Sequence, residues 1–304
     1  MRTGVKRALK ALGGVVAGTV AVGVVYAMVQ TSRFDASLEK VYDVPVPDVV
    51  ASKDPAVIER GKHLATAVTG CTSHACHGTD FGGGAVTPMG PLGTLAAPNL
   101  TSASLGAAYS DGEFARAIRH GIKKDGRSVR LMPSQEMGWL PDDDIVALVS
   151  YLRSVPPVER ENQPMTVKTL GKILDRQDKI VFDVARRIDH TKIETPPAPA
   201  ATAEYGAFLT RACTGCHGEH LSGGRLPGSP PSIPTPLNLT PDGSGLKDWT
   251  FDDFEKLMRT GVRKNGKTLD PFMPIESWRN FDDVEMHAIW AYLRTVPPVL
   301  LGSR

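Results

Sequence analysis

The stretch "CTGCH" at residues 213–217 places a histidine directly after the second of two cysteines that are separated by two residues. In an exported chain this is the attachment pattern of c-type haem. Two thioether bonds would fix the edge of the porphyrin, and His217 would be carried beneath the iron as its proximal ligand. A disulfide between Cys213 and Cys216 is the alternative in an oxidising compartment, but it would not require the histidine. Zinc is disfavoured because the cluster offers too few ligands for a closed tetrahedral shell.

A second cysteine pair lies in "GCTSHACHG" at residues 70–78, where four residues instead of two separate Cys71 from Cys76. His77 again follows the second cysteine directly, so the residues that would place an iron ligand remain adjacent. The longer spacer can bulge outward as a loop, and His74 within it is expected to be exposed. The sequence therefore predicts covalent haem at this site as well, with a disulfide pair or incomplete attachment as the alternative.

An internal repeat supports the second site, because segments of the two halves match at a nearly constant offset in numbering. The matching segments are 97–101 with 236–240, 110–129 with 250–269, and 131–158 with 272–299. In this register, Cys76 and His77 lie over the corresponding cysteine and histidine of the second half. Repetition at a fixed period indicates a duplicated structural unit. We therefore expect two equivalent haem domains, at residues 55–158 and 200–299, joined by a partly helical connector at 159–199 that ends in a stiff proline-rich linker.

The repeat also selects two methionines as candidates for the sixth iron ligand. Met132 and Met273 align with each other, each precedes a proline, and they follow the proximal histidines at almost the same separation along the chain. Methionine is a common partner of histidine in electron-carrying haem. In contrast, Met89, Met137 and Met258 have no methionine at the aligned position. The alternative is that Met132 and Met273 are flexible core residues that share a loop.

Two further pairs of aligned residues are candidates for contacts around each haem. Pro88 and Pro227, which follow the proximal histidines at nearly equal separations, could present a carbonyl oxygen to the second imidazole nitrogen. Asn99 and Asn238 could donate hydrogen bonds to haem propionates. For both pairs, ordinary turn chemistry is the alternative.

Helix signals recur in both halves, and no convincing strand pattern accompanies them. The signals are capping boxes at Ser110–Glu113 and Thr250–Asp253 and helix-ending glycines at Gly121 and Gly261. The closing helices, expected to begin near Asp142 and Asp282, have apolar faces at helical spacing: Ile145, Leu148, Val149 and Leu152, and Met286, Ile289, Trp290 and Leu293. Gly61 and Gly206 lie in short helical stretches where a second helix could cross closely. The fold class is therefore expected to be all-α.

The N-terminal segment carries a membrane signal. Residues 11–29 contain no charged side chain. As a helix they would span about 28 Å, close to the roughly 30 Å hydrocarbon core of a bilayer. The positive charges before them would remain in the cytoplasm, which sends the rest of the chain to the outer side. Residues 1–30 are therefore expected to be an uncleaved anchor; the alternative is a cleaved signal peptide, for which Val25 and Ala27 could form a weak cleavage site.

The charge balance argues against nucleic acid as a partner. The formal net charge is +2, and Arg2, Lys6, Arg7 and Lys10 alone supply +4, which leaves residues 11–304 at −2. Phosphate binding needs a clustered basic face, so the basic N-terminus is better explained by the membrane.

With these motifs, both halves resemble class I cytochrome c domains. The "CTGCH" motif, the "MP" pair and the closing "AYLRTVPP", preceded by "NLTPDGSGLKDW", are similar to the membrane-associated multihaem cytochrome subunits of bacterial periplasmic dehydrogenases. The resemblance covers roughly residues 55–158 and 200–299. It implies an all-helical fold around two covalently bound haem c groups with four axial ligands: His77, Met132, His217 and Met273. Two features depart from it, because those subunits often have three haem domains and because the first attachment site has the longer spacer.

The resemblance implies electron transfer as the function. We expect a dihaem c-type cytochrome that carries single electrons, anchored to the bacterial inner membrane with its haem domains in the periplasm. The donor would be a periplasmic dehydrogenase or respiratory complex, and the acceptor an oxidase or another cytochrome. The alternative is a dihaem peroxidase or other haem oxidoreductase, whose catalytic iron keeps one position open, whereas a methionine on each iron would block that position.

Overall fold

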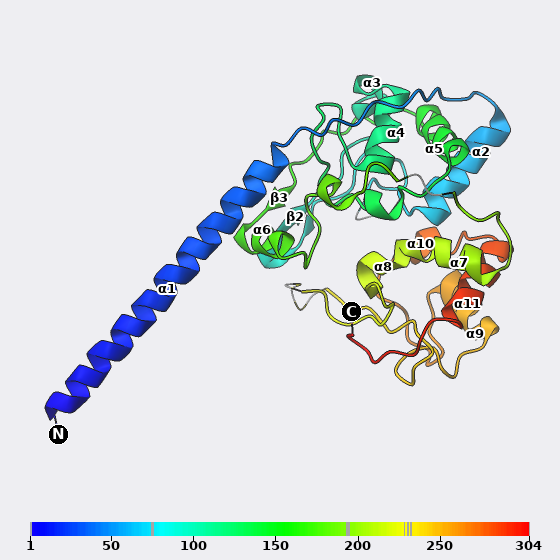
Figure 1. Ribbon diagram of the computed structural model, residues 1–304. Coiled ribbons are helices and arrows are strands. Elements are labelled where there is room, and N and C mark those ends of the chain that lie inside the picture. Colours follow the sequence, from blue (N-terminus) through cyan, green and yellow to red (C-terminus); the bar gives the residue numbers. More distant parts are fainter. Residues whose placement is uncertain are drawn as a thin grey trace.

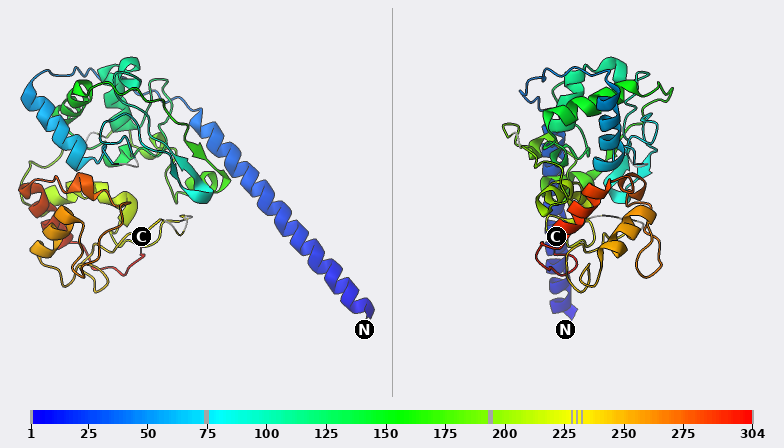
Figure 2. Two further views of the ribbon diagram at one scale, coloured as in Figure 1. Left: turned by 180° about the vertical axis from the view of Figure 1, so that it is seen from behind. Right: turned by 90° about the vertical axis from the view of Figure 1, so that its right-hand side faces the viewer.

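The computed structural model describes residues 2–73, 76–192, 195–227, 229, 231 and 233–303, and the loop residue His74 lies outside them. Figure 1 shows a single long helix that projects from a body made of two lobes. We call residues 55–158 the first lobe and residues 200–299 the second lobe. The long helix joins the first lobe, and the second lobe lies against the first, as both views of Figure 2 also show.

The long helix, α1, runs from Arg2 to Leu38. Within the described part of the chain, one helical segment is long and apolar enough to cross a membrane, and it lies in α1 at Leu9–Leu38. The apolar run at 11–29 is therefore entirely helical, and the helix continues beyond it. The last turns of α1 pack on the body, where the side chain of Phe34 is only 1% exposed.

The first lobe is built mainly from short helices. They are α2 (Pro55–His63), the π-helical turn η1 (Leu64–Val68), η2 (Gly90–Leu92), α3 (Leu105–Ala108), α4 (Asp111–His120), η3 (Ser134–Glu136) and α5 (Asp142–Ser154). Helix α2 packs against α5, and α4 contacts α5 as well. The predicted apolar face of α5 is confirmed, because Ile145, Leu148, Val149 and Leu152 are all buried.

The second lobe repeats this arrangement. Its helices are α7 (Ala203–Leu209), α8 (Arg211–His217), α9 (Phe251–Thr260), α10 (Ile275–Trp278) and α11 (Asp283–Leu293). Helix α7 packs against α11 as α2 packs against α5. On the predicted face of α11, Met286, Ile289 and Leu293 are buried, and Trp290 is partly buried against the core. The sequence repeat is thus also a structural repeat.

Equivalent glycines allow the closest helix crossing in each lobe. A Cβ atom on Gly61 would overlap the carbonyl oxygen of Ala147 in α5, and one on Gly206 would overlap the carbonyl oxygen of Ala288 in α11. Any larger side chain would force the helices apart. The prediction of close crossings at both glycines is confirmed.

The predicted helix caps are also confirmed. Ser110 accepts the backbone N–H of Glu113 at 3.2 Å, and the Glu113 carboxylate accepts the backbone N–H of Ser110 at 2.7 Å. The same reciprocal pair joins Thr250 and Asp253. Gly121 and Gly261 end these helices with left-handed backbone conformations, φ 63° and 72°. These caps fix where α4 and α9 begin and end in each lobe.

The prediction of an entirely helical fold misses a small sheet, although the class is mainly helical as predicted. Strands β1 (Thr87–Pro88), β2 (Gly93–Leu95) and β3 (Thr166–Val167) pair antiparallel in that order. Strands of two or three residues are too short to show the alternation that identifies a strand. The third strand also comes from the connector, which makes the pairing non-local.

The connector holds α1 against the first lobe. It contains α6 (Thr169–Arg176), which packs along α1, and η4 (Ala185–Arg187). Phe34 of α1 and Phe182 of the connector belong to one small apolar cluster. The fully buried carboxylate of Asp175 accepts the backbone N–H groups of Phe182 at 2.7 Å and Asp183 at 3.0 Å. We call residues 169–187 the clasp, because they fasten the helix to the lobe.

The two lobes share one hydrophobic core cluster. Between them, α8 packs on η3, and α10 packs on η1. Trp139 of the first lobe meets Phe208 of the second edge-on, with ring centroids 3.8 Å apart. His63 of α2 also pairs with the buried Glu285 of α11 at 2.9 Å. The lobes are therefore in extensive, partly apolar contact.

Candidate functional site

The first candidate site is a cavity in the first lobe that is lined by Cys71, His77 and Met132. Most of the remaining lining is apolar and includes Leu100, Phe114, Ile118, Met137 and Leu148. The structure therefore brings a thiol, an imidazole and a thioether from two distant chain segments into one apolar cavity. Cys76 is half-buried and is not part of the lining.

The imidazole of His77 is oriented by a backbone carbonyl. Its Nδ1 atom lies 2.9 Å from the carbonyl oxygen of Pro98, so Nδ1 carries the proton and donates it. The ring is only 8% exposed, and burial lowers the pKa of His77 below its ordinary value. The ring is therefore neutral near pH 7, with its remaining lone pair on Nε2. This is the state in which histidine binds a metal.

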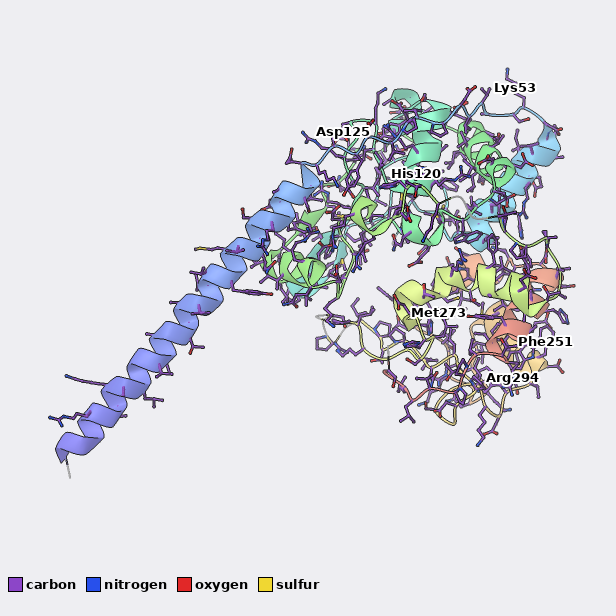
Figure 3. All side chains as sticks on the ribbon, in the orientation of Figure 1. Lys53, His120, Asp125, Phe251, Met273 and Arg294 are labelled. Atoms are coloured by element: carbon purple, nitrogen blue, oxygen red, sulfur yellow. The ribbon has the colours of Figure 1, made fainter. Side chains whose placement is uncertain are left out.

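The second candidate site repeats this geometry. Helix α8 carries Cys213, Cys216 and His217, and the Nδ1 atom of His217 lies 2.7 Å from the carbonyl oxygen of Leu237. His217 is 5% exposed, and the side chains of Cys213 and Met273 pack against the shared core. Figure 3 shows Met273 beneath α8 in the second lobe. Both lobes thus orient a buried imidazole through the residue that precedes an aligned asparagine.

The prediction that Pro88 and Pro227 supply these carbonyls is wrong. Pro88 is part of β1, where it pairs with Thr94 of β2, and the carbonyls come instead from Pro98 and Leu237. The number of residues after His77 could not reveal this, because the loop that follows it forms the β1–β2 hairpin before the chain returns to the imidazole at Pro98. The sequence feature that marks the two carbonyls is the repeated Asn-Leu-Thr, which directly follows Pro98 and Leu237.

For Asn99 and Asn238 the structure shows contacts that favour the turn alternative over donation to haem propionates. Both side chains are buried, and both Oδ1 atoms accept from the threonine two residues further along. The Asn99 amide donates to the carbonyls of Val158 and Arg160, and the Asn238 amide donates to Val299 and Ser244. Each asparagine therefore tethers the chain end of its lobe to the loop that holds the histidine.

The cysteines of the first site are half-buried thiols. Cys71 Sγ lies 3.1 Å from the hydroxyl of Thr69, and burial raises the pKa of Cys71. Burial likewise raises the pKa of Cys76 to about 11 and that of Cys213 in the second lobe to about 12. Cys71, Cys76 and Cys213 are therefore protonated near pH 7. Neither a reactive thiolate nor a thiolate metal ligand is favoured in such surroundings.

Met137 lies at the first site, although the internal repeat did not select it as a ligand. It is 5% exposed and lines the same cavity as Met132. The aligned residue in the second lobe is Trp278, so the repeat gave no reason to select it. Met132 and Met137 are thus both near His77, and a test of the distal ligand has to separate them.

The attachment segment of each lobe faces the other lobe. In the first lobe, the hydroxyl of Thr72 lies 3.3 Å from that of Ser277 in the second. In the second lobe, Gly215 lies between its two cysteines, and a Cβ atom there would come within 2.5 Å of the Glu136 carboxylate of the first. Ser277 and Glu136 are equivalent in the repeat. The two sites therefore meet through matching surfaces.

The donor set of each lobe fits haem c. Each lobe has two cysteines, a buried histidine whose Nδ1 is taken up by a carbonyl, and a methionine that packs toward the core. Two cysteines followed directly by a histidine with a neutral imidazole are the arrangement that holds this group. An apolar lining around the first histidine and methionine also suits the porphyrin face.

Comparison with known proteins agrees with this donor set, since residues 58–156 and 203–297 match the Cytochrome c family. The chain is 39% identical over 112 residues to the gluconate 2-dehydrogenase cytochrome c subunit of Pantoea cypripedii, covering 34% of this chain and 25% of that one. It is 36% identical over 114 residues to the cytochrome c subunit of alcohol dehydrogenase (quinone) of Gluconacetobacter polyoxogenes, covering 35% and 24%.

A longer match is with the fructose dehydrogenase cytochrome subunit of Gluconobacter japonicus. It is 32% identical over 275 residues, which cover 83% of this chain and 55% of that subunit. The match to the first two relatives thus spans about a quarter of their length, and the match to the third about half.

Proposed function

Because the chain belongs to the cytochrome c family, we propose that it is a membrane-anchored dihaem cytochrome that carries single electrons. One haem c would be attached through Cys71 and Cys76, and the other through Cys213 and Cys216. The bound group supplies an iron that changes its oxidation state by one electron. The protein's part is to hold the group, to set its potential and to keep other reactions away from it.

The observation that carries this proposal is the repeated arrangement around the two histidines. His77 and His217 are buried, and each donates from Nδ1 to a backbone carbonyl. The carbonyl fixes the ring orientation and makes Nε2 a better donor to a metal. The adjacent cysteine would determine where the porphyrin edge lies. The same constellation in both lobes supports two equivalent electron-carrying sites.

Met132 and Met273 are the proposed distal ligands. A thioether on the sixth position raises the potential and leaves no site for a substrate, which favours carriage over catalysis. Met132 lines the cavity that contains His77, and Met273 packs on the core beside the attachment helix. In this proposal the chain is an electron-transfer subunit, and the chemistry on a substrate belongs to a partner.

Electrons would cross between the lobes at the attachment segments. Thr72 contacts Ser277, and Glu136 contacts the segment that contains Gly215. Since each attachment segment would hold its group through the cysteines, both groups would be held close to this interface. Electron transfer through this contact would make the two lobes one electron-transfer path and not two independent carriers.

A periplasmic dehydrogenase is the proposed electron donor, and a respiratory oxidase or another cytochrome is the proposed acceptor. The relatives support the donor class, because they are named as cytochrome subunits of gluconate, alcohol and fructose dehydrogenases. We propose residues 11–29 as the anchor in the bacterial inner membrane. The hydrogen bond from Gln177 of the clasp to the hydroxyl of Tyr26 supports retention of this segment, because cleavage after Ala27 would remove Tyr26.

Intact-mass measurement and optical spectroscopy on the full chain test this proposal. We expect a mass with two covalent haems and an uncleaved N-terminus, and low-spin spectra for both irons. A mass with one haem and a Cys71–Cys76 disulfide would contradict the first site. A wild-type haem that is high-spin and turns over peroxide would replace carriage by a peroxidase function.

A further inference from the structure

The depth of α1 in a bilayer can be fixed from its charges. Lys10 and Arg33 frame a stretch without charged residues, and Tyr26 lies near its outer end. A hydrocarbon core of roughly 30 Å takes about 20 helical residues, so a core that begins after Lys10 ends near residue 30. Tyrosine is enriched where a spanning helix leaves the hydrocarbon for the headgroups. Tyr26 therefore lies near the outer boundary of the membrane.

The clasp reaches down to this depth. Lys172 pairs with Asp35 of α1 at 2.7 Å, and further along the clasp the side chain of Gln177 donates to the hydroxyl of Tyr26 at 2.9 Å. Helix α6 thus runs antiparallel to α1, with its C-terminal end toward the membrane. Figure 1 shows α6 beside the part of α1 nearest the body.

The chain turns immediately after this contact. Asp178 has a left-handed backbone, φ 59°, and the backbone N–H of Lys179 donates to the carbonyl of Leu174 at 2.9 Å. The chain then returns to Phe182, which is buried against Phe34. The lowest point of the clasp is consequently the turn at residues 177–180.

Buried charges keep this turn in place. Asp175 and Asp183 are both 0% exposed and both pair with Arg176, at 2.6 and 3.2 Å. Asp178 pairs with Arg186 at 2.8 Å and with Arg187 at 3.0 Å. Such a network is costly to break, because a single lost partner leaves a buried charge uncompensated. The turn is therefore a fixed part of the body and not a loose connection.

We propose that the turn at residues 177–180 is a membrane contact site that rests on the phospholipid headgroups around α1. This inference depends on the proposed role of α1 as an anchor. The side chains of Gln177, Asp178 and Lys179 are exposed. The clasp carries five lysine and arginine residues against three aspartates. The carboxylate of Asp178 is held by two arginines, so Lys179 presents an exposed positive charge to phosphate groups.

Photo-crosslinking of the full haem-containing chain in phospholipid nanodiscs tests this contact. A benzophenone amino acid replaces Lys179, and the mass of the irradiated protein is measured. We expect an adduct with the mass of one phospholipid. Lys53 is the matched control, because it is also an exposed lysine and lies just before the first lobe, far from α1 (Figure 3). The same replacement at Lys53 should give no lipid adduct.

Two further positions calibrate the depth. Leu170 is an exposed residue at the other end of α6, about 9 Å from Arg176 by helical rise and farther from the membrane, and its replacement should lose the adduct. Val24 lies in the apolar run and should form an adduct whenever α1 spans the bilayer. An adduct at Val24 without one at Lys179 would overturn the contact and leave the anchor intact. No adduct at either position would overturn both, while the haem mass would still report on electron carriage.

Discussion

The Nε2 atom of His63 in the first lobe lies 2.9 and 3.0 Å from the two carboxylate oxygens of Glu285 in the second lobe. Glu285 is 1% exposed, and it also accepts the backbone N–H of Asp282 at 2.9 Å. Hydrogen bonding to Glu285 raises the pKa of His63 above its ordinary value of 6.5. The raised pKa favours the imidazolium form of His63 in this contact between the two lobes.

The first prediction is that the contact between the lobes weakens as the pH rises above neutrality. A histidine whose pKa is raised by folding contributes its full stabilisation below the unfolded-state pKa, near 6.5, and loses it as the pH rises through the folded-state pKa. Amide hydrogen exchange in α2 and α11, corrected for the intrinsic rate, should therefore be less protected at pH 9 than at pH 6. In H63A this difference should disappear.

The variant H63A should also be less stable at neutral pH. It leaves a buried carboxylate without its cationic partner, at a cost of about 3 kcal/mol in the free energy of unfolding. The matched control is K62A, at the residue that precedes His63. It removes an exposed ion pair with Glu59 and should change stability little. Equal losses in the two variants would contradict a special role for His63.

A second prediction concerns the tether made by Asn99. The variant N99A should lose about 2–3 kcal/mol of stability, because the buried groups that it pairs are left without partners. Since Pro98 presents its carbonyl to His77, the potential of the first haem should shift while that of the second stays constant. Thermal unfolding and a redox titration measure the two effects. N265A is the control, because Asn265 is exposed and accepts the backbone N–H of Lys267, two residues away.

A third prediction separates the two methionines at the first site. M132L should convert one haem to a high-spin form that binds carbon monoxide when reduced, and should lower its potential, because leucine cannot ligate iron. M137L should remain low-spin and lose less than about 1.5 kcal/mol, since the exchange nearly conserves volume. Optical spectra of both variants decide the matter. The reverse pattern would identify Met137 as the ligand.

A fourth prediction concerns Glu136, which contacts the attachment segment of the second lobe. Burial raises the pKa of Glu136 to about 8. Above that pH the carboxylate is negative and favours the oxidised iron. The potential of the second haem should therefore fall by tens of millivolts between pH 6 and pH 9. E136Q should remove this decrease, whereas E276Q, at an exposed position of α10, should retain it. A redox titration that shows the same pH slope in E136Q and in the wild type would refute this coupling.

The sequence predicts the elements that depend on local chemistry. The Ser110–Glu113 box and the ending Gly121 lie within one helix and its termini, so a short window contains all that is needed to place α4. The crossing at Gly61 was also predictable, because only glycine permits such an approach. The adjacency of cysteine and histidine is equally local, which is why both candidate sites were found without a structure.

The contacts that were missed depend on segments far apart in the chain. The β3 strand pairs with β2 although α3, α4 and α5 all lie between them in sequence, and Asn99 bonds to Val158 at the far end of its lobe. Nothing in the sequence near Pro88 excludes it as the partner of His77, because the length of the intervening hairpin sets the outcome. The clasp was likewise hidden, since its partners Tyr26, Phe34 and Asp35 lie more than 130 residues earlier, in and just after the segment that hydropathy assigns to the membrane.

The junction between α1 and the clasp also restricts how the protein can meet its partners. A helix that continues without a break into a fixed apolar contact allows the body to spin about the membrane normal and to drift laterally, but not to rise or tumble. Encounters then become a search in a plane, at one height above the lipid. A redox centre on another membrane protein can exchange electrons with this one only if it is exposed in the same thin layer.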